Sequence, residues 1–486
     1  MNHRFLFKGF TPYLIVIAAV FSPLLPFSLI RGTGLHDNQR IVEVVCASLS
    51  GITVIAGLFR SNLILRSCNN RVICLLTAFF LLGLASGIRA YSPRYAFFEW
   101  ANFLLIFGAS CLIAFEIAAN GDAMLDQILR LCGLGCAFYI FVAIIVYVVL
   151  INAGGQPSNA VFIPGFDNYR FFNHVQTITL PLLGLWTCRS GVGKQKTFAV
   201  GVTSIWWTLL FVSAGRGTFI GLLAGICVTW FYLRKDALPW CRVMLRSALI
   251  GSGAYLAFYV LIPLSLGLQP FGFLFIVVER TMGDPGSGRW HLWTRAWEIM
   301  LAHPWLGAGP LHFAHFGRDI QNGAHPHNWV LQIACEWGIP ALLCLVIAIA
   351  LGLKRLLSVR QYLDPTDVKN HLTLAAWLTI GVAILVDGLV SGLIVMPTSQ
   401  LWIALYIGCA WGWTVSMTPA TQTTILRLPM TVRIGGGAIL LTSIYFLANG
   451  LWPEIRNLPA YEEQTLQKDL YPNPAFWPRI WLGGYF

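Results

Sequence analysis

Apolar runs about 20 residues long recur along the chain, separated by short polar segments. A helix needs about 20 apolar residues to cross a hydrocarbon core about 30 Å thick, so each run predicts a membrane-spanning helix. The runs at 172–187 and 398–416 are the shortest, and one of the two could be re-entrant. Thirteen spans are predicted, at 10–30, 41–59, 72–88, 97–116, 128–151, 172–187, 197–213, 217–233, 246–266, 329–352, 372–394, 398–416 and 434–452.

Composition agrees with this pattern. Hydrophobic residues make up 57% of the chain and charged residues 11%, against about 25% charged in an ordinary soluble domain. The first run contains Pro23 and Pro26 and no small-residue cleavage site, so it reads as a retained helix rather than a signal peptide. The twelve cysteines lie mostly singly inside spans and carry no functional signal. The predicted fold class is an all-α, polytopic membrane protein of 12–13 transmembrane helices.

The net charge of +12 raises the question of a nucleic-acid partner. The basic residues are instead split among short loops, as the positive-inside rule requires of a protein in a lipid bilayer. With the N-terminus inside, every lysine except Lys468 falls on the inner side. The basic residues of the outer side are otherwise arginines, among them Arg170, Arg216, Arg280, Arg289, Arg295 and Arg318.

This contrast between lysine and arginine favours an anionic ligand at the outer face, because the planar guanidinium matches phosphate and carboxylate geometry. The alternative is that these arginines reach lipid phosphates or pair with Asp284, Glu298 and Asp319. Arg216 is the least free of them, since it lies in the tight turn 213–217 between two spans. The glycines beside it allow close approach of a ligand, although a tight turn needs them equally.

One long segment, 267–328, interrupts the spans, and the chain divides into helices (1–266), this outer loop (267–328), further helices (329–452) and an outer tail (453–486). Long ordered loops in compact proteins are usually functional. Apolar residues at helical spacing predict a helix over 289–300 that begins at Arg289, where free backbone donors and the dipole also favour an anion. The tryptophans of this loop fit an amphipathic helix at the membrane interface better than a sugar-stacking site.

Four histidines follow, at His312, His315, His325 and His327. They could form a zinc site, but neither a cysteine nor a carboxylate completes it at a usual spacing, so we expect no metal and no other cofactor. A near-neutral pKa makes histidine the natural base for removing a proton from a sugar hydroxyl. His327 is the better candidate, because Asn328 and the span 329–352 follow it directly and it would cap the outer end of that helix.

Two carboxylates inside predicted spans need an explanation, because a charge in the bilayer is costly. Glu336 follows His327 by nine residues, about half a turn around a helix, so it faces away and is expected to hold neighbouring elements together. Asp387 should lie within its span and could pair with an arginine.

The motifs together are similar to the O-antigen ligase and polymerase superfamily of bacterial membrane glycosyltransferases. The resemblance rests on His327-Asn328-x-x-Leu331-x-x-x-x-Glu336-x-Gly338, preceded by Ser287-Gly288-Arg289 and Gly215-Arg216-Gly217. The polar run 168–177 resembles the element that these proteins place before the sixth span. Its candidate substrate-binding residues are Arg170, Asn173, His174 and Gln176, to which we add His325, Asn328 and Arg295 from the loop.

The resemblance implies a metal-independent, inverting glycosyl transfer at the periplasmic face of the bacterial inner membrane. The donor would be a glycan on undecaprenyl pyrophosphate, with His327 as the base and Arg216 and Arg289 on the pyrophosphate. Lipid A-core is the acceptor that an O-antigen ligase uses, and the helix count and the absence of a large soluble C-terminal domain favour the ligase. A Wzy-type polymerase, which extends the glycan, and a protein O-oligosaccharyltransferase remain open.

A transporter or flippase for lipid-linked glycans is the rival from another class. Transporters are often built from repeated halves. This chain shows no evident repeat, and its polar residues concentrate in one outer loop. The outer tail, Glu454 to Phe486, matches no motif of the superfamily.

Overall fold

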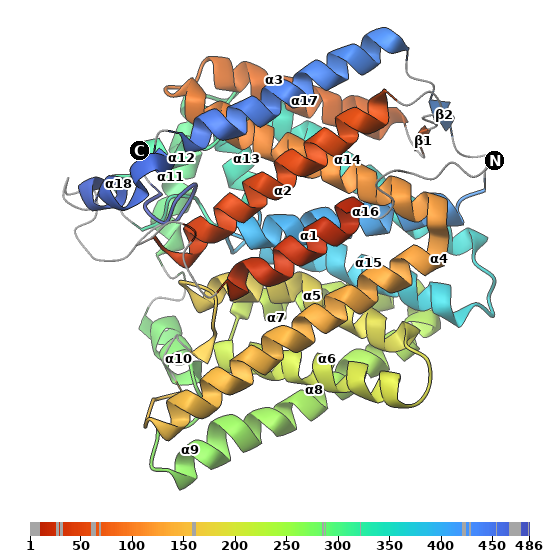
Figure 1. Ribbon diagram of the computed structural model, residues 1–486, viewed down its shortest axis with the longest axis vertical. Coiled ribbons are helices and arrows are strands. Elements are labelled where there is room, and N and C mark those ends of the chain that lie inside the picture. The colour runs from red at the N-terminus through yellow and green to blue at the C-terminus, as the bar shows by residue number, and fades with distance from the viewer. Residues whose placement is uncertain are drawn as a thin grey trace.

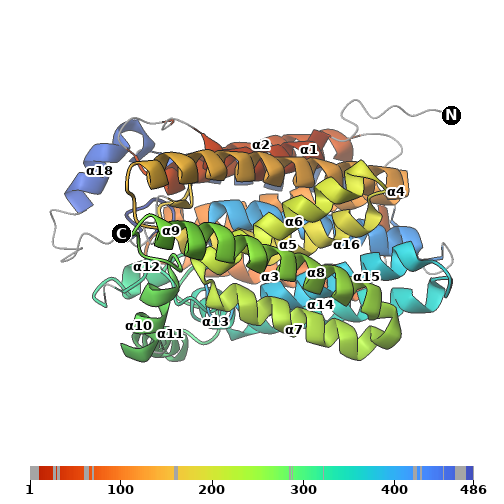
Figure 2. The ribbon, with the colours of Figure 1, turned by 90° about the horizontal axis from the view of Figure 1, so that it is seen from below.

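The computed structural model is a bundle of long helices that run side by side between two ends of the molecule (Figures 1 and 2). Eight helical segments among the described residues are long and apolar enough to cross a membrane. The predicted all-α, polytopic membrane fold is therefore confirmed. The structure describes residues 10–25, 29, 33–59, 65–67, 70–157, 162–283, 286, 288–320, 322–419, 424–426, 429–452, 454–465, 478–484 and 486.

The first half of the described chain contributes nine α-helices and one strand. They are α1 (Phe10–Phe21), α2 (Leu35–Leu58), β1 (Leu65–Ser67), α3 (Asn70–Ile88), α4 (Pro93–Asn152), α5 (Tyr169–Arg189), α6 (Lys194–Ser213), α7 (Arg216–Leu233), α8 (Leu238–Leu256) and α9 (Ile262–Ser265), with 3-10 turns η1 (Ser22–Leu24) and η3 (Arg234–Ala237) and a π-helical turn η4 (Ala257–Leu261).

The second half begins in the predicted outer loop. It contains α10 (Leu274–Gly283), α11 (Arg289–Ala302), α12 (Phe313–Phe316), α13 (Trp329–Trp337), α14 (Ile339–Ser358), η5 (Val359–Tyr362), α15 (Val368–Asp387), α16 (Pro397–Met417), β2 (Thr424–Leu426), α17 (Met430–Leu451), η7 (Glu454–Asn457) and α18 (Leu458–Thr465). The two short strands pair antiparallel and join the connections after α2 and after α16.

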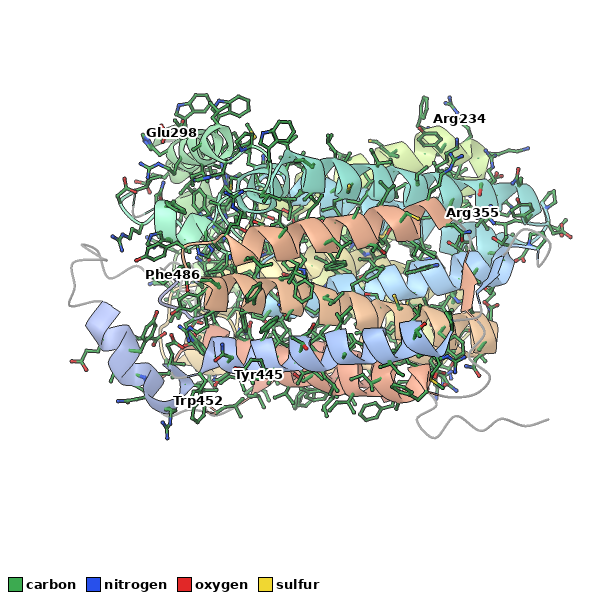
Figure 3. All side chains as sticks on the ribbon, turned by 90° about the horizontal axis from the view of Figure 1, so that it is seen from above. Arg234, Glu298, Arg355, Tyr445, Trp452 and Phe486 are labelled. Atoms are coloured by element: carbon green, nitrogen blue, oxygen red, sulfur yellow. The ribbon has the colours of Figure 1, made fainter. Side chains whose placement is uncertain are left out.

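The two ends of the bundle differ in what they carry. Helices α10, α11, α12 and α18 gather at one end, which we call the loop end, and β1 and β2 lie at the other (Figure 1). Figure 3 shows Glu298 and Phe486 at the loop end and Arg234 and Arg355 at the opposite end, which we call the basic end. The arginines of the short connecting loops thus lie away from the long loop, as a fixed orientation in a membrane requires.

Helices α5 and α16 form the centre of the bundle. Each has 21 residues, and nearly all residues of α5 from Phe172 to Thr187 are buried. At 1.5 Å per residue such a helix is about 31 Å long, enough to cross the hydrocarbon core. The prediction that one of these two segments could be re-entrant is therefore wrong, because both are full-length helices whose buried polar residues lower their hydropathy.

Two predicted spans are continuous in the structure. The spans at 97–116 and 128–151 belong to one 60-residue stretch, α4, which breaks only at Gly121 (φ 60°, ψ −144°). A residue with a side chain rarely adopts this conformation, so glycine allows the turn without an intervening loop.

The predicted span at 329–352 is instead broken in two. Gly338 (φ 91°, ψ 161°) ends α13 after nine residues, and α14 starts directly behind it with Pro340 in its first turn. Pro340 also lacks the backbone donor that a continuous helix would need. His327 consequently precedes a short helix of the loop end, α13, rather than capping a membrane-spanning helix as predicted.

Candidate functional site

A polar cavity opens at the loop end, with an empty volume of about 980 Å³ including its mouth. Its walls come from the start of α5, the turn between α6 and α7, the start of α11, the turn before α13 and the end of α15. The lining residues with polar or charged side chains are Asn168, Tyr169, Arg170, Asn173, His174, Arg216, Thr218, Arg289, His325, His327, Asp387 and Ser391. Residues predicted separately along 220 positions of sequence thus meet in one place.

Three arginines face this cavity, and each lies at a helix N-terminus. Arg216 and Arg289 are the first residues of α7 and α11, and Arg170 is the second residue of α5. The first turn of a helix leaves backbone N–H groups unpaired and carries the positive end of the dipole, so these ends attract anions. Three guanidinium groups stand against one carboxylate, Asp387, in the cavity wall.

Arg216 is held by its surroundings. Its Nη1 donates a hydrogen bond to Oγ1 of Thr281 in α10 (2.8 Å). Ala214, two residues before Arg216, has a left-handed backbone (φ 47°), which lets the chain turn back directly after α6. Helix α10 of the long loop therefore holds the Arg216 side chain through this hydrogen bond.

His327 lies at the opposite wall and also has a left-handed backbone, with φ 53°. A non-glycine residue in this region costs about 1–3 kcal/mol and is kept where surrounding structure requires it. Asn328, the next residue, caps α13, since its side-chain oxygen accepts from the N–H groups of Val330 (3.0 Å) and Leu331 (3.1 Å). The cap holds the turn that directs His327 into the cavity, and it satisfies two of the first N–H groups of α13.

Burial is the main reason why the pKa of His327 lies well below its usual 6.5. The charges of Arg289, Arg170 and the nearby His174 lower this pKa further. Both effects disfavour the imidazolium. The ring is therefore neutral at neutral pH and able to accept a proton.

The other three of these four histidines each make contacts within the protein. His325 is buried against His327, with ring centroids 4.0 Å apart. His312 uses both ring nitrogens, with Nδ1 at 2.9 Å from the carbonyl oxygen of Pro310 and Nε2 accepting from the N–H of Ser92 (2.8 Å). Nδ1 of His315 contacts the carbonyl oxygen of Phe486 (2.9 Å). Within the described part of the chain, the structure contains no group of three or more side chains suited to a metal ion.

Asp387 joins the start of α7 to α5. Its Oδ2 accepts hydrogen bonds from Oγ1 of Thr177 (2.5 Å) and Oγ1 of Thr218 (3.5 Å). A Cβ atom at Gly217 would overlap its Oδ1. These hydroxyl contacts help to set the position of the helix that begins with Arg216, and Asp387 also interacts electrostatically with Arg289.

Two residues of α5 keep unused polar atoms beside the cavity. Nδ1 of His174 and Oδ1 of Asn173 have no hydrogen-bond partner among the described residues, although both side chains are about 95% buried. The amide nitrogen of Asn173 is used, since it donates to Ser213 and Gln176. Buried polar groups are normally paired, so these two atoms are suited to a bound ligand.

Four predicted residues lie outside the lining of the cavity. Gln176 is buried and donates to the carbonyl of Trp206 (3.0 Å), and Asn328 caps α13. Arg295 pairs with Asp319 through both terminal nitrogens and with Glu298, which is the alternative considered for the outer arginines. Glu336 is fully buried and pairs with Arg479 (2.8 Å). Ser287, Asp284 and Lys468 lie outside the described residues.

No sequence motif indicated that the tail contributes to the site, yet Pro478 forms part of the cavity wall. The only signal was indirect: a buried glutamate, Glu336, without an identified partner. An arginine in a tail that matches no motif was an available counterion, but many arginines were equally available.

Comparison with known families gives one match. A family model described as O-antigen ligase matches residues 201–346. The matched segment runs from α6 into α14 and contains Arg216, Arg289 and His327, whereas Arg170, Asp387 and the tail lie outside it. None of the curated proteins matches the chain. Residues 201–346 are therefore similar to the O-antigen ligase family, in agreement with the superfamily that the sequence motifs predict.

Proposed function

We propose that the chain is an O-antigen ligase, which transfers a glycan from undecaprenyl pyrophosphate to lipid A-core at the periplasmic face of the bacterial inner membrane. The observation that carries this proposal is the convergence of three helix N-termini, each with an arginine, and a neutral histidine on one cavity at the loop end. An anion site and a base thus lie in the same cavity, which is the combination that transfer from a pyrophosphate requires.

The donor pyrophosphate would bind between Arg216 and Arg289. Each guanidinium can donate two parallel hydrogen bonds to phosphate oxygens, and each lies at the N-terminus of its own helix, where the helix dipole favours an anion. As the glycosidic C–O bond breaks, negative charge grows on the leaving pyrophosphate. Fixed donors directed at that charge stabilise the transition state without a metal ion.

His327 would act as the general base. Its neutral ring removes the proton from the acceptor hydroxyl, whose oxygen attacks the anomeric carbon on the face opposite the leaving group. One bond forms between the acceptor oxygen and that carbon, one breaks to the pyrophosphate oxygen, and the configuration inverts. A positioned base of this kind contributes about 10²–10⁴-fold to a rate.

Hydroxyl groups of the sugars would form hydrogen bonds with the two polar atoms of α5 that have no partner among the described residues. Oδ1 of Asn173 can only accept a hydrogen bond, and Nδ1 of His174 can accept or donate according to the tautomer. A substrate rich in hydroxyl groups supplies such partners, while the arginines take the phosphates.

The two ends of the bundle support this orientation. By the positive-inside rule, Arg234 and Arg355 at the basic end would lie in the cytoplasm and the loop end with its cavity would lie outside (Figure 3). In a Gram-negative inner membrane the outside is the periplasm, where lipid-linked O-antigen and lipid A-core meet.

Purified protein in detergent tests the proposal, given undecaprenyl-pyrophosphate-linked glycan and one acceptor at a time. Glycan on lipid A-core supports the ligase. Products that carry two or more repeats without lipid A-core identify a polymerase, and glycosylated protein acceptor identifies a protein O-oligosaccharyltransferase. Lack of product with any acceptor, together with movement of lipid-linked glycan across sealed vesicles, would identify a transporter.

The same assay tests metal independence. Full turnover in EDTA is expected, because the charge of the leaving group is met by arginines. Activity that disappears in EDTA and returns with zinc would contradict the mechanism and point back to the histidine cluster.

A further inference from the structure

The last described residues of the chain, 478–484 and 486, fold back into the loop end, and we call them the C-terminal segment. Its backbone carbonyl at Arg479 accepts hydrogen bonds from Nη2 of Arg40 (2.8 Å) and contacts Nε2 of His36 (3.3 Å), both in α2. The N–H of Leu482 donates to Oδ1 of Asp37 (2.7 Å). The segment is therefore docked by specific polar contacts and not merely laid against the surface.

Arg479 is the centre of this docking. Its side chain is about 1% exposed, and its Nη2 donates to both carboxylate oxygens of Glu336 (3.0 and 2.8 Å) and to Oε1 of Glu99 (3.1 Å). Glu336 belongs to α13 and Glu99 to α4. One guanidinium thus connects the short helix of the loop end with the membrane bundle.

A second buried arginine completes the network. Arg40 pairs with Glu43 (2.5 Å) and donates to Gln400 (3.0 Å), and Asn102 donates to both of these partners. Two buried arginines therefore face three buried glutamates. Removing one cation from such a network leaves an uncompensated buried charge, which is strongly destabilising.

Through Glu336, Arg479 is connected to α13 and to the turn that carries His327, the proposed base. Oε1 of Glu336 also accepts from the N–H of Phe313 (3.1 Å), and its carbonyl oxygen accepts from the N–H of Gly309 (3.0 Å). The other end of α13 is fixed by the N–H of Trp329, which donates to the carbonyl of Gly388 (2.9 Å). His327 lies two residues before Trp329, so the two ends of this nine-residue helix determine where its ring points.

We propose that Arg479 is a positioning residue for the transfer reaction: it holds Glu336 and α13, and thereby the turn that presents His327. This inference rests on the proposed function of His327 as the base. Arg479 lies outside residues 201–346, which the family model matches, and the inference comes from its contacts alone.

The position of the donor site predicts which kinetic parameter, kcat or the donor KM, changes when Arg479 is replaced. Arg216 belongs to α7, which the C-terminal segment does not hold through any contact described above, whereas Arg289 belongs to α11, which packs against α13. Loss of the Arg479 contacts should therefore disturb His327 directly and the pyrophosphate site only through Arg289. The expected effect is a lower kcat at an almost unchanged KM for the donor.

Arg479→Lys tests this in the full chain, because lysine keeps the charge, but its shorter side chain does not place a nitrogen where Nη2 contacts both carboxylates. We expect kcat to fall at least tenfold and the donor KM to stay within twofold. Arg94→Lys is the matched control, since Arg94 pairs with Glu454 at the same end of the molecule and is absent from the cavity lining. Wild-type kcat for Arg479→Lys, or equal changes in kcat for both variants, would overturn the proposal.

Glu336→Gln and the double variant extend the test if Arg479→Lys folds poorly. Glu336→Gln should also lower kcat at constant KM, and the double variant should be no worse than the poorer single variant. Effects that multiply would mean that the two residues act independently, and the proposal would fail. If wild-type protein transfers no glycan, the proposed function fails instead, and a thermal-unfolding cycle on the same four proteins still decides whether Arg479 and Glu336 are coupled.

Discussion

His325 and His327 contact each other across Pro326. Their ring centroids lie 4.0 Å apart, and the backbone N–H of His327 is 3.3 Å from Nδ1 of His325. This contact leaves Nδ1 of His325 as an acceptor, so the proton of its neutral ring is on Nε2. His325 thereby stabilises the left-handed turn at His327, and the ring of His327 lines the cavity.

His327→Ala should lower kcat by about 10²–10⁴-fold, the usual contribution of a general base. The donor should still bind, because Arg216 and Arg289 are unchanged, and a filter or fluorescence assay of donor binding would check this. His303→Ala, at an exposed position of the same loop, is the control. Near-normal turnover of His327→Ala would remove it as the base.

Arg216→Lys and Arg289→Lys should each weaken donor binding or turnover by roughly tenfold to hundredfold. The charge is kept, but a lysine cannot donate two parallel hydrogen bonds to a phosphate, and bonds to charged groups contribute about 1.5–3 kcal/mol. Arg318→Lys, on the exposed surface of the loop, should change kcat/KM less than twofold. If both cavity variants also keep wild-type kcat/KM, the pyrophosphate does not bind through paired hydrogen bonds from these guanidinium groups.

The pH profile of kcat/KM should be flat from about pH 8 to below pH 6.5. Burial and the charge of Arg289 hold the pKa of His327 well below 6.5, so the active neutral form persists as the pH falls and is lost only in acid. A bound pyrophosphate adds negative charge and raises this pKa, so the acid limb of kcat should lie at higher pH than that of kcat/KM. Identical limbs in both profiles, or a limb near pH 6.5 in kcat/KM, would contradict this assignment.

Gly338→Ala should reduce both stability and activity. Gly338 has a left-handed φ of 91°, and a Cβ atom there would overlap the carbonyl oxygen of Trp305. Gly352→Ala, in the middle of α14, is the matched control, because a Cβ atom would meet nothing within 4 Å. Thermal unfolding and turnover should separate the two variants clearly, and equal behaviour would show that the break between α13 and α14 is not required.

Hydropathy was enough to predict the helical membrane fold, because the bilayer requires long apolar runs whatever else the protein does. It failed at 329–352, where the run Trp337-Gly338-Ile339-Pro340 stays apolar while the backbone turns. Glycine and proline together were a signal for that break. A hydropathy window averages over backbone conformation and therefore does not register it.

The sequence predicted individual residues of the site but not how their side chains are arranged. Charge asymmetry selected arginines, but it could not separate Arg289, which lines the cavity, from Arg295, which pairs with Asp319 and Glu298. Only the direction in which each side chain leaves α11 distinguishes them. The role of Arg479 depends on contacts with residues hundreds of positions away, and no local pattern in the sequence encodes such a contact.

The docking of Arg479 also has a meaning for biosynthesis. Its partners Glu99 and Arg40 precede it by 380 and 439 residues, so the ribosome makes the carboxylates long before their counterion. A nascent chain that has inserted α2 and α4 must carry Glu99 unneutralised by Arg479 until translation reaches residue 479. The network is thereby completed only once residue 479 has been made, and we expect a chain that stops before this residue to be inactive even when its helices have already entered the membrane.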